Sequence, residues 1–291
     1  MFTRYKLSVH TATPDDRQKL ANLIHFEIYV HRHLDWRSPL DWLGHQPYLV
    51  AEQNGRILAA LACPPDPPKV AWLRLFAASS EISVRRAWEA LWPEAHTQLL
   101  ETPGLKRIAA IPLQNWFHNL LAESDFQETH RVVMLNWEPG RQASRAPVSL
   151  PADVTIRPMN FDDLVYVEEI DASSFGSVWQ NSQESLELAF RQAAVATVAE
   201  RHSQMLAYQI STGTPMGGHL ARLAVHPDFQ GLGIGYALVR DLLSQFERRG
   251  AQSVSVNTQQ DNYVSLSLYE KAGFRRTGEE YPVFQCDPVS D

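Results

Sequence analysis

Apolar positions along the chain recur with two periods, one of two residues and one near 3.6, which predict strands and helices respectively. In the second half, strands are expected near residues 154–158, 195–200, 204–211, 217–225, 253–258, 274–279 and 281–286. Helices are expected near 161–173, 184–194, 233–249 and 263–272. Because three strands follow one another before the third helix, the predicted fold is a mixed α/β (α+β) sheet, and not an alternating strand–helix array.

The first half repeats this order of elements. Strands are expected near 6–11, 48–53, 56–62, 70–77, 107–112 and 131–137, and helices near 14–30, 83–100 and 114–122. The stretches "LSVHTATPDDRQKLANLIHF" and "VTIRPMNFDDLVYVEEIDASSF" each predict a strand, a turn with paired Asp and a helix. The stretches "NWFHNLLAESDFQET" and "NYVSLSLYEKAGFRRT" correspond in the same way. We therefore expect two copies of one fold, each a mostly antiparallel twisted sheet flanked by helices, with chance similarity as the alternative.

The length of 291 residues fits two domains. The stretch "EPGRQASRAPVSLPAD" is rich in proline and serine and predicts a linker over 138–153 between domains at 1–137 and 154–291. There is no signal-peptide pattern and no apolar run of membrane-spanning length, so a cytoplasmic protein is expected. Cys63 and Cys286 have no metal-binding or redox spacing, and no metal is expected.

The net charge of −7 arises in the last part of the chain, because residues 154–291 carry 10 basic and 17 acidic side chains. This imbalance disfavours nucleic acid as a partner. It mildly favours a cationic substrate, although a solvated acidic surface gives the same count.

The stretch "HPDFQGLGIGYALV" places Gly231, Gly233 and Gly235 between a strand that stops at Pro227 and a predicted helix. Each ordered glycine costs roughly 0.5–1 kcal/mol relative to alanine, so a close approach to the backbone is expected there. Backbone N–H groups at a helix N-terminus favour an anion such as phosphate. The spacing is neither that of a dinucleotide-binding loop nor that of a P-loop.

The pattern Gln230-x-x-Gly233-x-Gly235 directly after "LAVHP" resembles the coenzyme A pyrophosphate loop of the GNAT acetyltransferase superfamily. The later stretch "NYVSLSLYEKAGF" is similar to the coenzyme-contacting helix of that family, with Asn262 and Tyr269 at matching positions. The resemblance covers 154–286 and implies acetyl-CoA as cosubstrate. It implies that the backbone of Leu223, Ala224 and Val225 pairs with the pantetheine arm, and that Asn262 binds this arm from the other side. The pyrophosphate is then expected on Gln230, Gly231, Leu232, Gly233, Ile234, Gly235 and Tyr236.

Acetyl transfer to an amine needs a donor for the developing oxyanion, an acid for the departing thiolate and a neutral amine. The resemblance implies the Val225 N–H as the donor and Tyr269 as the acid, with aromatic packing as the other interpretation of Tyr269. The position of the family's usual carboxylate base falls on His219, and a second position falls on Asn257, which cannot accept a proton. A histidine is a suitable base at neutral pH, but water-relayed deprotonation and a purely structural His219 remain alternatives.

The first copy lacks this loop, because "FAASSEISVRRAWEALW" (76–92) contains no glycine and adds a glutamate. The resemblance is thus to a tandem GNAT arrangement with a degenerate N-terminal copy. The function predicted is an acetyl-CoA-dependent N-acetyltransferase acting on a primary amine of a small molecule or peptide, without nucleic acid or membrane partners. A homodimer is left open. The alternatives are a non-catalytic acyl-CoA sensor, which Asn257 favours, and a structural scaffold.

Overall fold

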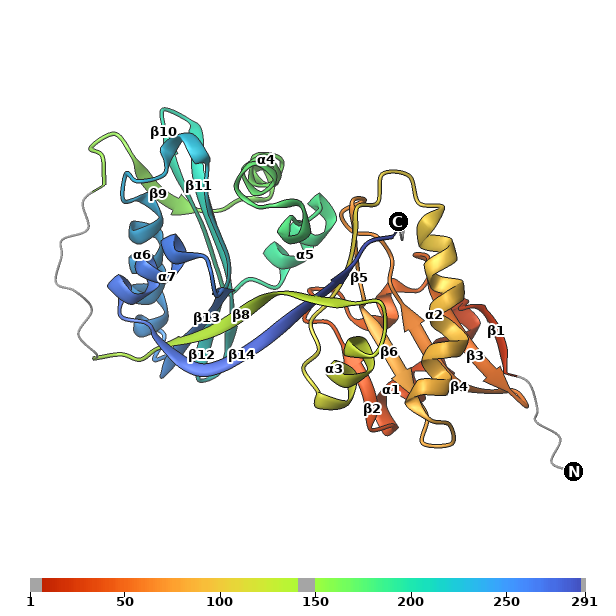
Figure 1. Cartoon of the computed structure of the whole chain (residues 1–291). Coiled ribbons are helices and arrows are strands. Elements are labelled where there is room, and N and C mark those ends of the chain that lie inside the picture. Colours follow the sequence, from red (N-terminus) through yellow and green to blue (C-terminus); the bar gives the residue numbers. More distant parts are fainter. Residues whose placement is uncertain (1–6, 141–149, 289–291) are drawn as a thin grey trace, which may run out of the picture. The chain divides into compact units, whose positions relative to one another are not determined.

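The computed structural model describes residues 7–140 and 150–288, and their contacts divide the chain into two compact units (Figure 1). The first unit comprises the chain up to Thr129 together with the segment from Pro282, and the second unit runs from His130 to Tyr281. The predicted linker 138–153 falls largely on 141–149, which lies outside the described residues.

The second unit is a predominantly antiparallel sheet with two helices on each face. Figure 1 draws α6 and α7 on one face and α4 and α5 on the other. Its strands lie in the order β8-β13-β12-β11-β10-β9, and of these neighbours, as far as the structure describes them, β12 and β13 alone are parallel. In chain order the elements are β9 (Thr155–Pro158), α4 (Leu164–Ser174), α5 (Gln183–Arg191), β10 (Val195–Arg201), β11 (Gln204–Thr214), β12 (Gly217–Val225), α6 (Ile234–Arg248), β13 (Ser253–Gln259), α7 (Tyr263–Ala272) and β14 (Arg275–Cys286).

The parallel strands β12 and β13 part after four residue pairs. Their pairing begins at Gly217 with Ser253 and ends at Leu220 with Val256. The next residue of β12, Ala221, is the extra residue of a β-bulge against β11. Because a bulge bends the strand that carries it, β12 turns away from its neighbour at this point. Beyond the bulge, β12 pairs only with β11 within the described part of the chain.

The first unit contains a five-stranded sheet in the order β1-β3-β4-β6-β2 and a second set of strands, β5, β7 and the end of β14. Helix α1 packs on one face of the larger sheet, and α2 and α3 pack on the other. The elements are β1 (Ser8–Thr11), α1 (Arg17–Phe26), β2 (Tyr29–Arg32), β3 (Tyr48–Gln53), β4 (Arg56–Ala62), β5 (Val70–Trp72), β6 (Leu75–Ala78), α2 (Val84–Leu100), β7 (Arg107–Ala110), α3 (Asn115–Ala122) and β8 (Gln127–Trp137).

Three sequence-based element assignments were wrong. The helix expected over 14–30 ends at Phe26, and the backbone turns extended at Glu27 (φ −91°, ψ 152°) to form β2. The strand expected over 70–77 is two strands, because β5 pairs with β7 and β6 pairs with β4 and β2. The two closing strands expected near the C-terminus are the single strand β14, which contains Gly278 at φ 90°.

The division into units also differs from the expected boundaries at 137 and 154. Residues 130–137 belong to the second unit, because residues 132–137 of β8 pair with β13. Residues from Pro282 belong to the first unit, because Phe284 to Cys286 pair with β7. The last strand of each sequence copy thus completes the sheet of the other copy.

Gly218 provides a test of the packing beneath the parallel strands. A Cβ added there would lie 2.5 Å from the Phe246 ring on α6. We expect Gly218→Ala to lower the free energy of unfolding by roughly 1–3 kcal/mol, because overpacking displaces a buried ring. Gly176→Ala is the control, because an added Cβ there meets no atom within 4 Å. Chemical denaturation measures both, and equal midpoints for the two variants would contradict this packing.

Candidate active site

The open edge of β12 lies beyond the bulge and carries the three backbone positions predicted to bind a ligand, Leu223, Ala224 and Val225. The N–H of His226 donates to Leu206 O of β11 at 2.9 Å. Successive amides of a strand point to opposite sides, so the Val225 N–H points away from β11, toward the open edge. The structure thus leaves this donor available.

The carbonyl of Val225 accepts two side-chain hydrogen bonds at the end of this edge. Gln230 Nε2 donates to it at 3.0 Å and Ser174 Oγ donates at 3.1 Å. Gln230 therefore holds the loop after β12 against the strand, in addition to any contact with a ligand. Ser174, at the end of α4, carried no signal in the sequence.

The glycine loop ends in a helix N-terminus without a side-chain cap. Gly231 (φ 77°) and Gly233 (φ 80°) adopt the left-handed conformation that favours glycine. Helix α6 begins at Ile234, and its first backbone bond runs from Ala237 N to Gly233 O at 3.0 Å. The N–H groups of 234–236 precede this bond and have no acceptor within the described parts of the chain. These groups and the helix dipole suit a phosphate.

Gly235 is required by packing. An added Cβ would lie 3.0 Å from Leu268 Cδ1 of α7 and 3.4 Å from Val225 Cγ2 of β12. Three elements converge at this residue, which is buried in the first turn of α6. The missing side chain of Gly235 thus lets α7 approach β12, and contact of this residue with a ligand remains a prediction.

Around the loop, the side chains of Leu232 and Tyr236 differ in exposure. Leu232 is exposed, whereas Tyr236 is buried and its hydroxyl lacks a hydrogen-bond partner in the described part of the chain. The Lys271 ammonium lies 4.6 Å from the centre of the Tyr236 ring. The loop therefore combines open backbone donors and a nearby cation, a set that fits a phosphate-bearing ligand such as coenzyme A.

Asn262 caps helix α7. Its Oδ1 accepts a hydrogen bond from Ser265 N at 3.1 Å, and its Nδ2 donates to Gln259 Oε1 at 3.3 Å. An Asn at this position satisfies a helix N–H that has no partner within the helix. The capping role is thus visible in the structure, and contact with a pantetheine arm remains a prediction.

Tyr269 lies on the buried side of α7 and packs against Phe274, with ring centres 5.7 Å apart. Its hydroxyl makes no hydrogen bond within residues 7–140 and 150–288. Burial raises the pKa of Tyr269, and the positive charge of Arg222 opposes this rise. A phenol with a raised pKa is protonated at neutral pH and can donate its proton.

His219 lies one residue before the last pair of the parallel ladder, where β12 and β13 part. Its Nδ1 is 2.9 Å from Ser255 Oγ on β13. Burial lowers the pKa of His219, and a hydrogen bond with the Asn257 side chain opposes this shift. The imidazole is therefore neutral at pH 7 and able to accept a proton. The same contacts also suit a structural histidine.

A buried charged network that the sequence analysis missed lies beside Tyr269. Asp171 of α4 is fully buried and accepts hydrogen bonds from Tyr208 OH at 2.5 Å and Arg222 Nε at 2.7 Å. Its other oxygen accepts from Asn181 N at 2.9 Å. Arg222 also donates to Trp179 O at 2.5 Å. The network thus ties β12 to the segment between α4 and α5.

The sequence held two signals of this network. Asp171 lies on the apolar face of α4, four residues after the buried Val167, and Arg222 interrupts the apolar stretch from Leu220 to Val225 of β12. A charged residue in each position predicts a buried pair, since an unpaired buried charge is costly.

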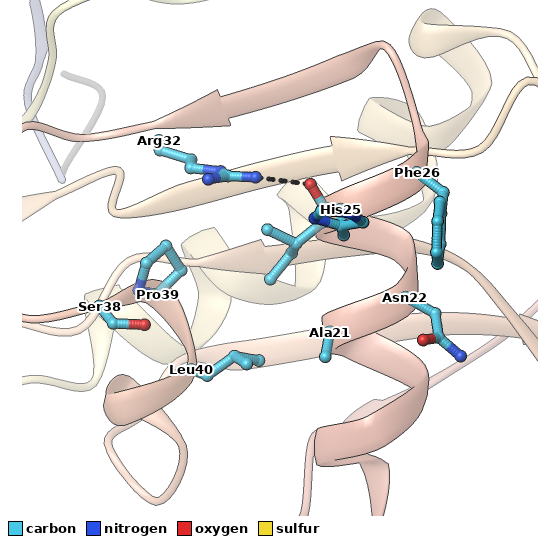
Figure 2. Close-up of a pocket in the computed structure, with 9 residues that line it drawn as sticks. Ala21, Asn22, His25, Phe26, Arg32, Ser38, Pro39 and Leu40 are labelled. Atoms are coloured by element: carbon cyan, nitrogen blue, oxygen red, sulfur yellow. Dashed lines mark hydrogen bonds between the residues drawn. The ribbon is translucent and has the colours of Figure 1, made fainter.

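Two cavities lie away from this site. One, of about 440 Å³, lies in the first unit between α1, Arg32 and residues 38–40 (Figure 2). There Arg32 donates to Ile24 O at 2.6 Å. The other, of about 290 Å³, lies beside Gly217 at the start of β12, whereas the glycine loop follows its end. Neither includes a residue predicted for the site.

Two other kinds of site are absent from the described residues. No cluster of three or more His, Cys, Asp or Glu side chains has an arrangement that could hold a metal ion there. No helix of that part of the chain has both the length and the apolar character needed to cross a membrane.

Sequence comparison finds proteins similar to part of the second unit. The sequence model of the Acetyltransferase (GNAT) family matches residues 164–274. N-alpha-acetyltransferase 30 of Schizosaccharomyces pombe is 36% identical over 67 residues, which are 23% of this chain and 45% of that protein. A Bacillus subtilis protein named as a candidate ribosomal-protein alanine N-acetyltransferase is 26% identical over 123 residues, covering 42% of this chain and 82% of that protein.

Structural comparison extends the similarity to the whole chain. The tandem GNAT protein from the clavulanic acid biosynthesis pathway superposes with a TM-score of 0.63 at 15% identity, over 98% of this chain and 100% of that one. At this identity the similarity shows the fold alone. Residues 164–274 therefore match the Acetyltransferase (GNAT) family, and the chain as a whole shares the fold of the tandem GNAT protein.

Proposed function

We propose that the protein transfers an acetyl group from acetyl-CoA to the primary amine of a small molecule or peptide, in the second unit. The observation that carries the proposal is the open edge of β12, which leads directly into a left-handed glycine loop at an uncapped helix. An extended pantetheine arm can pair with such an edge, and a pyrophosphate suits the helix N-terminus.

The proposal assigns to the coenzyme the residues that the family resemblance implies. The backbone of 223–225 pairs with the arm, the loop from Gln230 to Gly233 and the first turn of α6 bind the phosphates, and Asn262 contacts the arm. Gly231 and Gly233 have no side chain to obstruct the amides. Acetyl-CoA, when bound, supplies the activated acetyl group.

Two side chains handle protons in the proposed reaction. Tyr269 donates its proton to the departing thiolate, and the nearby charge of Arg222 stabilises the phenolate that remains. His219 accepts a proton from the amine, directly or through water. The Val225 N–H stabilises negative charge that develops on the acetyl oxygen.

Two further observations support an amine acceptor. The relatives in Schizosaccharomyces pombe and Bacillus subtilis are both named as N-acetyltransferases. The acidic excess over 154–291 favours a cationic acceptor. We propose that the segment held by Arg222, between α4 and α5, forms part of the acceptor site, because it is fixed to the strand that carries His219.

Coenzyme binding is tested by Gly233→Glu, which adds a bulky negative side chain at a positive φ. At 100 times its dissociation constant, coenzyme A should stabilise the wild type by roughly 2.7 kcal/mol, and the variant should lose this shift. The control is Gly250→Glu, because Gly250 also has a positive φ (77°) and no atom within 4 Å of an added Cβ. Thermal unfolding with and without coenzyme gives the shifts. An unchanged shift in Gly233→Glu would exclude this loop.

Tyr269→Phe keeps the ring and removes the proton donor. We expect kcat to fall about 10²–10⁴-fold with little change in coenzyme affinity, as for loss of a general acid. Tyr263→Phe on the exposed side of the same helix is the control and should retain full activity. Steady-state kinetics with a panel of amines gives the comparison. Full activity in Tyr269→Phe assigns this residue to packing, and no turnover by the wild type favours the acyl-CoA sensor.

His219→Asn tests the base through its pH dependence. Because the pKa of His219 is lowered, the wild-type kcat/KM should fall only as the pH drops below about 6.5, where the imidazole gains a proton. The variant should lose at least about tenfold near pH 7 and recover at high pH, where the amine deprotonates unaided. His202→Asn, at an exposed turn, is the control. If the pH profiles of kcat/KM for His219→Asn and the wild type superimpose, water and not His219 accepts the proton.

A further inference from the structure

In the first unit, a strand of the chain itself covers the edge that is open in the second unit. Strand β6 pairs with β4 on one side, as β12 pairs with β11. On its other side β6 pairs antiparallel with β2, from Tyr29 opposite Ala78 to Arg32 opposite Leu75. In the second unit no strand pairs with β12 at the equivalent place within the described residues.

We treat β6 as the equivalent of β12 because the first unit also contains two parallel strands that part. Strand β5 pairs in parallel with β7, up to Trp72 opposite Ala109. Leu73 N still donates to Ala109 O at 2.8 Å, but the next amide, of Arg74, donates to Ala62 O of β4. The chain therefore leaves β7 between these two residues, as β12 leaves β13 after Leu220.

At the loop end of β2, the carboxylate of Glu27 binds the segment that replaces the glycine loop. One oxygen accepts a hydrogen bond from Ser79 Oγ at 2.9 Å, and the other accepts from Ser80 N at 2.9 Å. These two serines immediately follow β6 and precede helix α2. A negatively charged group of the chain thus lies on a backbone N–H in the loop between strand and helix.

At the other end of β2, His31 reaches the point where the strands part. Its Nε2 lies 3.1 Å from Leu73 O, and its ring stacks on Phe117 with centres 4.1 Å apart. Burial lowers the pKa of His31 to about 4, so the ring is neutral and Nε2–H donates to this carbonyl. The imidazole fixes β2 beside the parting of β5 and β7.

We infer that residues 27–32 are a built-in substitute for coenzyme, filling along β6 the place that coenzyme A takes along β12. The comparison with coenzyme rests on the function proposed above. Residues 27–32 present their groups in the same order as a bound coenzyme would. An anion lies at the loop, an extended backbone follows the strand edge, and the segment ends where the parallel strands part. In the first unit, β2 therefore occupies the strand edge and no coenzyme binds there. The second unit holds the single coenzyme site.

The first experiment needs no coenzyme. In Glu27→Ala, hydrogen exchange of peptides covering 27–32 and 75–80 should accelerate about tenfold, because the anchor of β2 to the loop is lost. The control is Glu89→Ala on the exposed side of α2, which should leave both peptides unchanged. Unchanged exchange in Glu27→Ala, or equal acceleration in both variants, would overturn the inference.

The second experiment counts coenzyme A by isothermal titration. We expect one equivalent of coenzyme A per chain for the wild type and none for Gly233→Glu, in which the edge of β6 covered by β2 is the one remaining place for coenzyme. Two equivalents in the wild type would show that coenzyme displaces β2 and would overturn the inference. One equivalent in Gly233→Glu would overturn it if residues 75–80 then exchange more slowly on adding coenzyme, and would otherwise exclude the glycine loop of the proposed function. No binding to the wild type would overturn the proposed function, and the exchange result for Glu27→Ala would still decide the role of residues 27–32.

Discussion

The parting of two parallel strands is the constraint on which both units depend. In the second unit it follows from the short ladder between β12 and β13, which stops at Leu220 and Val256, and from the bulge at Ala221. A strand edge that loses its neighbour leaves backbone groups without partners, and such groups must find another acceptor or donor. In the second unit no strand pairs with them within the described residues, and the proposed partner is coenzyme, whereas the first unit satisfies them with β2.

The geometry of the open edge is maintained by packing on one face and by charge on the other. On one face, Gly235 lets Leu268 of α7 approach Val225, so that the loop, the strand and α7 meet. On the other, Arg222 and the buried Asp171 hold the segment after α4 against the strand. Removing one member of such a buried pair leaves an uncompensated charge, so the network favours a single arrangement of this segment.

The sequence predicted the parts that depend on local pattern and motif. The elements around the glycine loop, from β12 through α6 to α7, follow from periodicity, whereas the positive φ of Gly231 and Gly233 was visible only in the structure. The sequence did not predict β2. A strand of four residues directly after a helix shows too little alternation of apolar and polar positions, and its partner β6 lies more than 40 residues away. The two charges of Asp171 and Arg222 were each visible in the sequence, but their pairing, like the pairing of β8 with β13 and of β14 with β7, depends on contacts distant in sequence.

The central claim is that coenzyme binds along the open edge of β12 and nowhere along β6. Hydrogen exchange of the wild type with and without saturating coenzyme A tests it most directly, because it reports on both edges in one sample. The account predicts slower exchange over residues 223–236 and no change over 27–32 and 75–83. Slower exchange along 75–83, or faster exchange of β2 on adding coenzyme, would contradict it.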